Sequence, residues 1–324
     1  MKVPMIKFLI AIVTVLALIR PASAQQVVGL VTNPQGTLTY LLGIGLAKLA
    51  NEKAGIVVRH QPSGGTSQMM PQLDSGEFEF AMFSAIDMID GYGGAGSYPG
   101  KPARNLRAVA VIGQFYFSFF VRNESPARTV ADTKGMRIPS EFPAARVVVR
   151  STEAYLAAAN MSFADYIQQP VGNLQQGGNE FKAGRVDLGL LPVGAGATIE
   201  LNASIPGGIR YISMPGSPEA IARMQKVVPV VYPSVLQPAT QYPGIREPTT
   251  VMTYDIYLAA SAHAKDELVY KMVQTMHDNR DALVAAFAGF RDYRPQEAAK
   301  NFPVPYHPGA IRLYTEKGLW PPKK

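Results

Sequence analysis

Three short runs of β-forming residues, at 27–31, 56–60 and 77–83, stand in the first part of the chain. Small polar loops follow the first two runs, and the stretch 38–51 repeats leucine at helical spacing. Strands that lead through short loops into helices, several times in succession, build sheets whose strands are largely parallel. The sequence therefore predicts an α/β fold.

The rest of the chain predicts a second unit of the same kind. A turn-forming stretch at 123–126 marks the entry to this unit, and a loop rich in proline at 228–248 marks the exit. We expect two lobes, with residues 25–125 plus 247–324 in lobe I and residues 126–246 in lobe II. The further expected elements are strands at 106–112, 115–121, 187–191 and 250–260 and near Met136, and helices at 152–160 and 266–287.

The N-terminal segment has the three parts of a secretory signal peptide. Lys2 and Lys7 form a basic start, residues 8–19 are an almost unbroken apolar run, and the small residues 22–24 offer a cleavage site. The alternative is an uncleaved anchor, but twelve apolar residues are too few to span a bilayer. We expect a signal peptide at 1–24, a mature chain that begins at Gln25, and a periplasmic location.

Charge and cysteine content narrow the function classes. The expected signal peptide carries three basic residues and no acidic one, so the mature chain has a formal net charge of +4. There is no basic block of the kind that binds nucleic acid. The chain has no cysteine, but its 324 residues can bury enough core without disulfides. We expect a monomer that does not itself cross the membrane.

Signatures of catalysis and of cofactors are missing from the sequence. The four histidines are scattered, no thiol is present, and we therefore expect no metal site and no cofactor. Residues 91–96 match the pattern G-x-G-x-x-G, but they follow a helical stretch instead of a strand. A dinucleotide site needs a strand before the glycines. We therefore interpret 91–96 as a loop.

Two strand-to-helix loops, at 36–37 and 63–67, combine glycine with hydroxyl side chains. Backbone N–H groups at a helix N-terminus favour an anion, and hydroxyls beside them can donate further hydrogen bonds. The alternative is ordinary helix capping by Thr37 and Thr66. Ser84 has the same two interpretations, because Asp87 stands where a capping box needs a carboxylate.

Segments spread over the whole mature chain carry a family resemblance. In chain order they are Gly36-Thr37 with Tyr40 and Gly43, Ser63-Gly64-Gly65-Thr66-Ser67, Leu73-Asp74-Ser75-Gly76-Glu77, Asn105-Leu106-Arg107-Ala108, Thr133-Lys134-Gly135-Met136-Arg137-Ile138, Ala183-Gly184-Arg185-Val186-Asp187, Asp266-Glu267-Leu268 and Pro305-Tyr306-His307-Pro308-Gly309. With these segments the chain resembles the solute receptors of TAXI-type TRAP transporters, the tripartite ATP-independent periplasmic transporters.

The resemblance implies a bilobal fold like that of periplasmic binding proteins, with crossing strands and a ligand cleft between the lobes. It implies binding of a small organic anion, a carboxylate or an amino acid, without catalysis, and delivery of this solute to a TRAP-type membrane permease. The residues expected at the ligand are Asn33, Gly36, Thr37, Tyr40, Ser63, Gly64, Gly65, Thr66, Ser67, Ser84, Arg146, Arg150 and Gly194.

The sequence departs from the family where related receptors carry a glycine-serine-glycine loop that helps to hold the ligand. This chain has 139–151 instead, with Arg146 and Arg150 in it. A guanidinium matches a carboxylate with two parallel hydrogen bonds, so we expect one of these arginines at the ligand. The alternative is that both merely solvate one helix face. Two other functions stay open, an exported enzyme on the same scaffold and a sensory receptor for another membrane partner.

Overall fold

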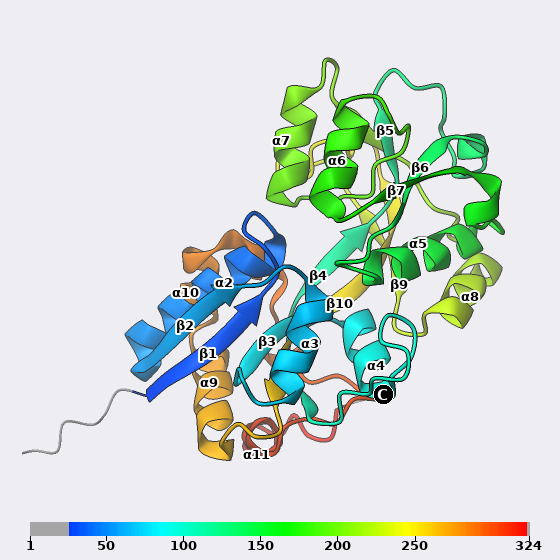
Figure 1. Cartoon of the computed structure of the whole chain (residues 1–324). Coiled ribbons are helices and arrows are strands. Elements are labelled where there is room, and N and C mark those ends of the chain that lie inside the picture. Colours follow the sequence, from blue (N-terminus) through cyan, green and yellow to red (C-terminus); the bar gives the residue numbers. More distant parts are fainter. Residues whose placement is uncertain (1–25, 323–324) are drawn as a thin grey trace, which may run out of the picture.

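The computed structural model describes residues 26–322, so the expected signal peptide lies outside the described residues. Figure 1 shows two lobes joined by long strands. The first lobe is built on a mixed sheet of order β2-β1-β3-β10-β4. β1 (Gln26–Thr32) pairs in parallel with β2 (Ile56–Pro62) and β3 (Phe80–Ser84). β10 (Thr249–Ser261) is antiparallel to β3 on one side and to β4 (Leu106–Phe117) on the other.

Helices cover both faces of this sheet (Figure 1). The connection from β1 to β2 runs across the sheet in one direction, and the connections through β3 to β4 run in the other. Since such crossovers are right-handed, the first connecting helix lies on one face and the next two lie on the other. The helices of this lobe are α2 (Leu38–Leu49), α3 (Thr66–Asp74), α4 (Ala85–Gly93), α9 (Asp266–Asp278), α10 (Arg280–Ala286) and α11 (Pro308–Glu316).

The second lobe has smaller sheets. Its elements are β5 (Phe120–Arg122), β6 (Arg137–Glu141), α5 (Val147–Ala158), β7 (Ile167–Val171), α6 (Leu174–Lys182), α7 (Gly196–Ser204), β8 (Ile209–Tyr211), α8 (Pro218–Val227) and β9 (Tyr232–Leu236). β5 pairs with β8 in antiparallel fashion, β6 with β7 in parallel, and β9 with the first half of β10. Short helical turns complete the chain at Ala50–Ala54, Ala131–Thr133, Phe163–Asp165, Ala288–Asp292 and Pro295–Glu297.

β4 and β10 connect the lobes, because the two ends of each strand lie in different hydrophobic cores. Val109 and Leu258 belong to the core of the first lobe, whereas Phe117 and Met252 belong to the core of the second. Ile86 of α4 is fully buried in the core of the second lobe, although its helix belongs to the first. The lobes are therefore in direct contact beside the connecting strands. The lobe boundaries at 125 and 246 stay a prediction.

Two sequence-based expectations of strands are wrong. Residues 106–121 form the single strand β4 up to Phe117, followed by the short β5, instead of two strands broken near Gly113. A register shift in the pairing with β10 absorbs the irregularity at Gly113, so the strand continues. The strand expected at 187–191 is reduced to an isolated bridge between Gly189 and Phe120.

The proline-rich stretch and the long C-terminal helix also differ from expectation. The stretch 228–248 contains β9, in which Pro233 lies opposite Met252. Proline is tolerated there because β9 is an edge strand with one unpaired side. The helix expected at 266–287 is divided into α9 and α10 at Asn279, whose φ of −130° and ψ of 40° leave the helical region.

Candidate functional site

The helix N-termini of the first lobe lie at one edge of its sheet. α2, α3 and α4 each follow a parallel strand, β1, β2 and β3 respectively, and the carboxyl ends of parallel strands meet at the same edge. The N–H groups in the first turn of a helix have no acceptor within that helix and carry a partial positive charge. This edge faces the second lobe (Figure 1).

The loop before α2 is held by its own hydroxyls. Thr37 caps the helix by accepting a hydrogen bond from the Tyr40 backbone N–H at 3.3 Å, and its hydroxyl donates to the Pro34 carbonyl at 2.7 Å. The Asn33 side chain donates to the Thr39 hydroxyl at 3.2 Å. The capping role of Thr37 is confirmed, and its loop is a compact polar cluster.

His60 supports this cluster from β2, although sequence reasoning did not select it. Its Nε2 lies 2.8 Å from the Thr32 hydroxyl, and its ring lies 5.0 Å from that of Tyr40. A Cβ at Gly43 would approach His60 Nε2 to 2.7 Å, so a side chain there would displace the imidazole. Burial lowers the pKa of His60, which favours the neutral ring.

The loop before α3 touches the second lobe. Gly65, and not Thr66, is the N-cap residue of α3, and its φ of 152° favours glycine. A Cβ on Gly65 would lie 2.2 Å from the carbonyl oxygen of Ala144, and the Ser67 hydroxyl lies 3.5 Å from the carbonyl oxygen of Pro143. The Gly64 N–H donates to the Gln68 side chain at 3.1 Å. This loop therefore meets the turn before α5.

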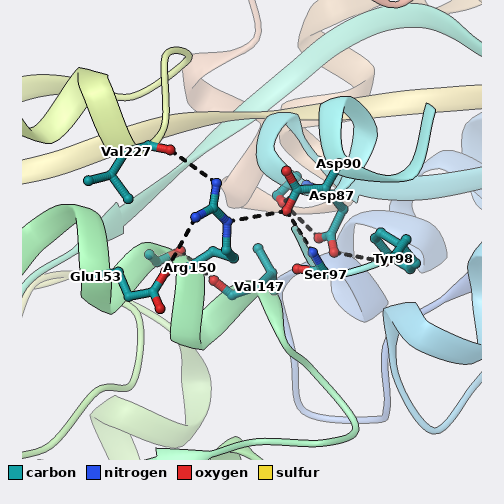
Figure 2. A network of polar contacts seen from close by, with 10 residues as sticks. Asp87, Asp90, Ser97, Tyr98, Val147, Arg150, Glu153 and Val227 are labelled. Atoms are coloured by element: carbon teal, nitrogen blue, oxygen red, sulfur yellow. Dashed lines mark hydrogen bonds and ion pairs between the residues drawn. The ribbon is translucent and has the colours of Figure 1, made fainter. Parts of the chain in front are cut away.

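Ser84 and Asp87 form the expected cap of α4. The Asp87 backbone N–H donates to the Ser84 hydroxyl at 3.0 Å, and that hydroxyl donates to the Asp87 carboxylate at 2.7 Å. The Tyr98 hydroxyl donates to the other carboxylate oxygen at 2.9 Å (Figure 2). Burial raises the pKa of Asp87 to about 6, despite the hydrogen bonds that oppose this shift. The Ser84 hydroxyl hydrogen is thus committed to Asp87.

The second lobe presents a strained turn to the loop before α3. Glu141 and Phe142 have φ angles of 72° and 43°, which side-chain-bearing residues rarely adopt. Phe142 is fully buried, and its anchoring carries Pro143 and Ala144 towards the first lobe. The hydroxyl of Ser140, which is buried at the start of this turn, has no hydrogen-bond partner among residues 26–322. Backbone strain of this kind concentrates at functional sites.

A second contact between the lobes lies at α7. A Cβ on Gly196, the first residue of α7, would lie 3.8 Å from the carbonyl oxygen of Gly36 in the loop before α2. Gly194 has a φ of 76°, and a Cβ there would lie 3.0 Å from the Tyr242 ring. The lobes therefore meet at two pairs of helix N-termini, α2 with α7 and α3 with α5.

The two arginines of the 139–151 segment differ in their surroundings. Arg146 occupies the N-cap position of α5 and is exposed. Arg150 lies 3.6 Å from Asp90 of α4 and 3.3 Å from Glu153, and it donates to the Val227 carbonyl at 3.0 Å (Figure 2). Arg150 would have to leave protein carboxylates to reach a ligand. Ligand contacts of all the expected site residues stay predictions.

The connecting strands carry a chain of hydrogen bonds on one face. The Tyr116 hydroxyl can donate to Gln114 at 2.9 Å or to Asp292 at 3.1 Å. Gln114 donates to the Tyr232 hydroxyl at 2.9 Å, and Tyr232 donates to Asp255 at 2.8 Å. Lys300 completes the chain through an ion pair with Asp255 at 2.6 Å. The strands between the lobes are thus tied to the C-terminal segment of the first lobe.

The described residues hold neither a metal-ligand cluster nor a membrane-crossing helix. Between residues 26 and 322, no group of three or more histidine, aspartate or glutamate side chains is arranged to hold a metal ion. Within the same range, no helix combines the length and the apolar character needed to cross a bilayer.

Solved structures with the same architecture come from several bacteria. MatC from Rhodopseudomonas palustris with bound malate is 12% identical, with a TM-score of 0.58 over 86% of this chain and 93% of that protein. The alkanesulfonate-binding protein SsuA from Xanthomonas axonopodis pv. citri bound to MOPS is 14% identical, with a TM-score of 0.51 over 91% and 94%. A TctC solute-binding protein from Polaromonas is 12% identical, with a TM-score of 0.50 over 82% and 88%.

These similarities establish the fold and not the ligand, because the identities are low. The expected bilobal α/β fold of periplasmic binding proteins, with parallel or mixed sheets in its lobes, is confirmed, and the main sheet is mixed. A family model described as NMT1-like matches residues 30–318. Since this match spans nearly all of the described residues, the chain belongs to the NMT1-like family.

Proposed function

We propose that this protein is a periplasmic solute-binding receptor that captures a small organic anion between its lobes. The observation that carries the proposal is the meeting of helix N-termini in pairs, α2 with α7 and α3 with α5. The N-termini of four helices thus lie near the contacts between the lobes, and their partial positive charges would favour an anion bound there. Hydroxyls of Thr37 and Ser67 stand beside these ends.

The structural neighbours support the same solute class. MatC was solved with malate and SsuA with MOPS, and both molecules carry an anionic group. A carboxylate or an amino acid is therefore the class we propose for this chain. Lobe closure would come from differential affinity, because a solute that contacts both lobes binds the closed form more tightly than the open form.

The partner that we propose is a TRAP-type membrane permease, on the strength of the family resemblance seen in the sequence. The receptor itself would act as a monomer without a cofactor. A sensory receptor for another membrane protein would use the same fold and solute. Binding of the purified receptor to vesicles that contain the permease, and solute uptake that depends on both proteins, distinguishes the two.

Binding without catalysis is the expected chemistry. The Thr37 and Ser67 hydroxyls meet backbone carbonyls, and the Ser84 hydroxyl, which meets the Asp87 carboxylate, is buried as the cap of α4. A solute incubated with the protein should be recovered unchanged by mass spectrometry. Conversion at a rate proportional to the protein concentration would favour the alternative of an exported enzyme.

A thermal-shift screen of dicarboxylates, sulfonates and amino acids identifies the solute, and two variants then test the site. Thr37→Val and Thr66→Val should each weaken binding about tenfold to a hundredfold, as expected for a lost hydrogen bond to a charged ligand, roughly 1.5–3 kcal/mol. Thr37→Val also removes a helix cap, so Ser217→Ala, which removes the cap of α8, is the matched control. Normal affinity in both threonine variants would move the site elsewhere.

Substitutions at Arg146 and Arg150 test whether an arginine of the second lobe binds the solute. Of the two, Arg146 is exposed and pairs with no carboxylate among residues 26–322, so it is the stronger candidate for a ligand carboxylate. If an arginine binds the solute through two hydrogen bonds, replacing it by Lys should lower solute affinity as replacing it by Ala does, because lysine keeps the charge and loses the planar guanidinium. If Arg146→Ala and Arg146→Lys bind the identified solute normally, the first lobe holds the anion without this residue.

A further inference from the structure

An ion pair joins the lobes beside the candidate site. Asp90 belongs to α4 of the first lobe and Arg150 to α5 of the second, and Arg150 Nε lies 3.6 Å from Asp90 Oδ2 (Figure 2). The Asp90 side chain is 6% exposed and that of Arg150 is 28% exposed. A carboxylate this deeply buried is costly unless a cation faces it, so the pair is sensitive to the separation of the lobes.

The glycine-rich loop after α4 is shaped around Asp90. The Ser97 backbone N–H donates to Asp90 Oδ2 at 3.0 Å, and the Ala95 N–H donates to the Asp90 carbonyl at 3.0 Å. A Cβ on Gly96 would lie 2.1 Å from the carboxylate, so only glycine leaves room for it. The pattern at 91–96, which does not bind a nucleotide in our interpretation, thus orients a carboxylate towards the second lobe.

Arg150 is held in place from within its own lobe. Its two terminal nitrogens contact the Glu153 carboxylate at 3.3 Å and the Val227 carbonyl at 3.0 Å. Its Nε is buried and has no hydrogen-bond partner within the described chain. The distance of 3.6 Å to Asp90 exceeds the usual N–H···O length of about 2.9 Å, so a small further approach of the lobes would satisfy Nε.

We propose that Asp90 and Arg150 are positioning residues for solute capture, which hold the closed arrangement of the lobes through an ion pair that neither lobe can form alone. The proposal rests on the proposed function as a solute receptor. Neither residue need touch the solute. Separation of α4 from α5 would expose the Asp90 carboxylate and the Arg150 Nε to water, so the pair stabilises the arrangement of the lobes in which the two helices are in contact.

Distances between spin labels test the pair without any solute. The chain has no cysteine, so Lys101→Cys in the first lobe and Ala222→Cys in the second can be labelled specifically at exposed positions. Asp90→Asn keeps an acceptor for Ser97 and removes the charge, and we expect it to lower the closed-to-open ratio about tenfold or more. Arg150→Gln should do the same, and the double variant should be no more open than either single one.

The control is Lys134→Gln, which removes a cation from the surface of the second lobe, where its side chain is 70% exposed, and should leave the distance distribution unchanged. If Arg150→Gln fails to fold because the Val227 contact is lost, Asp90→Asn alone decides. Unchanged distances in Asp90→Asn, or additive opening in the double variant, would overturn the proposal. Because no solute is present, the result is independent of the proposed function, which is tested separately by whether an anion shifts the melting temperature.

Discussion

Replacing Gly65 by alanine probes the closest approach between the lobes. The new Cβ would lie 2.2 Å from the Ala144 carbonyl oxygen, about 1 Å or more inside van der Waals contact. The obstructing atom is backbone in a turn anchored by the buried Phe142, so it cannot rotate away. The lobes therefore have to stay further apart, and the open form carries no such clash.

The free-energy cost of Gly65→Ala has two parts. The φ of 152° at Gly65 is costly for alanine in both open and closed forms, by about 1–3 kcal/mol, which corresponds to a melting temperature lower by several degrees. The clash adds a cost to the closed form alone. A loss of affinity of tenfold or more, for whichever solute the screen identifies, corresponds to about 1.4 kcal/mol or more of that cost.

Label distances between the lobes, calorimetric affinity and the melting temperature separate the two parts. Gly135→Ala is the matched control, because Gly135 also has a positive φ, of 78°, but a Cβ there meets nothing within 4 Å. The control should lower the melting temperature and leave closure and affinity alone. If Gly65→Ala closes and binds like the parent protein, the contact with Ala144 does not limit closure, and the reasoning fails.

Two further predictions concern buried titratable groups. Because the folded-state pKa of Asp87 is raised to about 6, the folded protein holds this proton more tightly than the unfolded chain, so the stabilisation is full below pH 3.8 and is lost as pH rises through about 6. Relative to Asp87→Asn, wild-type stability in urea should therefore fall by about 2 kcal/mol between pH 4 and 7, and parallel pH profiles would contradict this. His307 is 1% exposed, accepts a hydrogen bond from the Gly309 N–H and lies 3.2 Å from the Ala264 carbonyl oxygen. His307→Ala should therefore destabilise the protein by about 1–3 kcal/mol, lower its melting temperature and leave solute affinity intact. Loss of solute binding at unchanged stability would refute this prediction.

The features that the sequence predicted well depend on residues close together in the chain. Thr37 caps α2 and Ser84 caps α4, because a cap joins residues only three positions apart and is encoded where it acts. The order of strands, loops and helices has the same local origin, which is why the α/β class could be predicted, whereas the bilobal binding-protein fold was implied by the family resemblance. The break at Asn279 was missed, because helical periodicity continues on both sides of one non-helical residue.

Contacts between residues far apart in the sequence could not be predicted. Nothing near Asp90 points to a partner sixty positions away, and Arg150 was expected to face a ligand instead of a carboxylate of the other lobe. The closely spaced glycines that end at Gly96 were a sequence signal for this contact. Glycine is often required where the backbone or a carboxylate approaches the chain closely, as Asp90 approaches Gly96. The edge strand β9 was hidden by Pro233, because a proline within a run argues against a strand unless one side is unpaired.

The position of β10 has a consequence for how the chain folds. β10 lies between β3 and β4 in the first-lobe sheet, yet more than a hundred residues, including the whole of the second lobe, separate it from β4 in the sequence. A growing chain that has not reached residue 249 leaves both neighbouring strands with unpaired edges, so the first lobe cannot be completed by its own N-terminal segment. Pairing at such large sequence separation is slow, because loop closure precedes the contacts that reward it. Most of the second lobe is continuous in sequence and can begin to form first. Residues from 249 onward then complete both lobes, because β10 also supplies Met252 to the second core and pairs with β9.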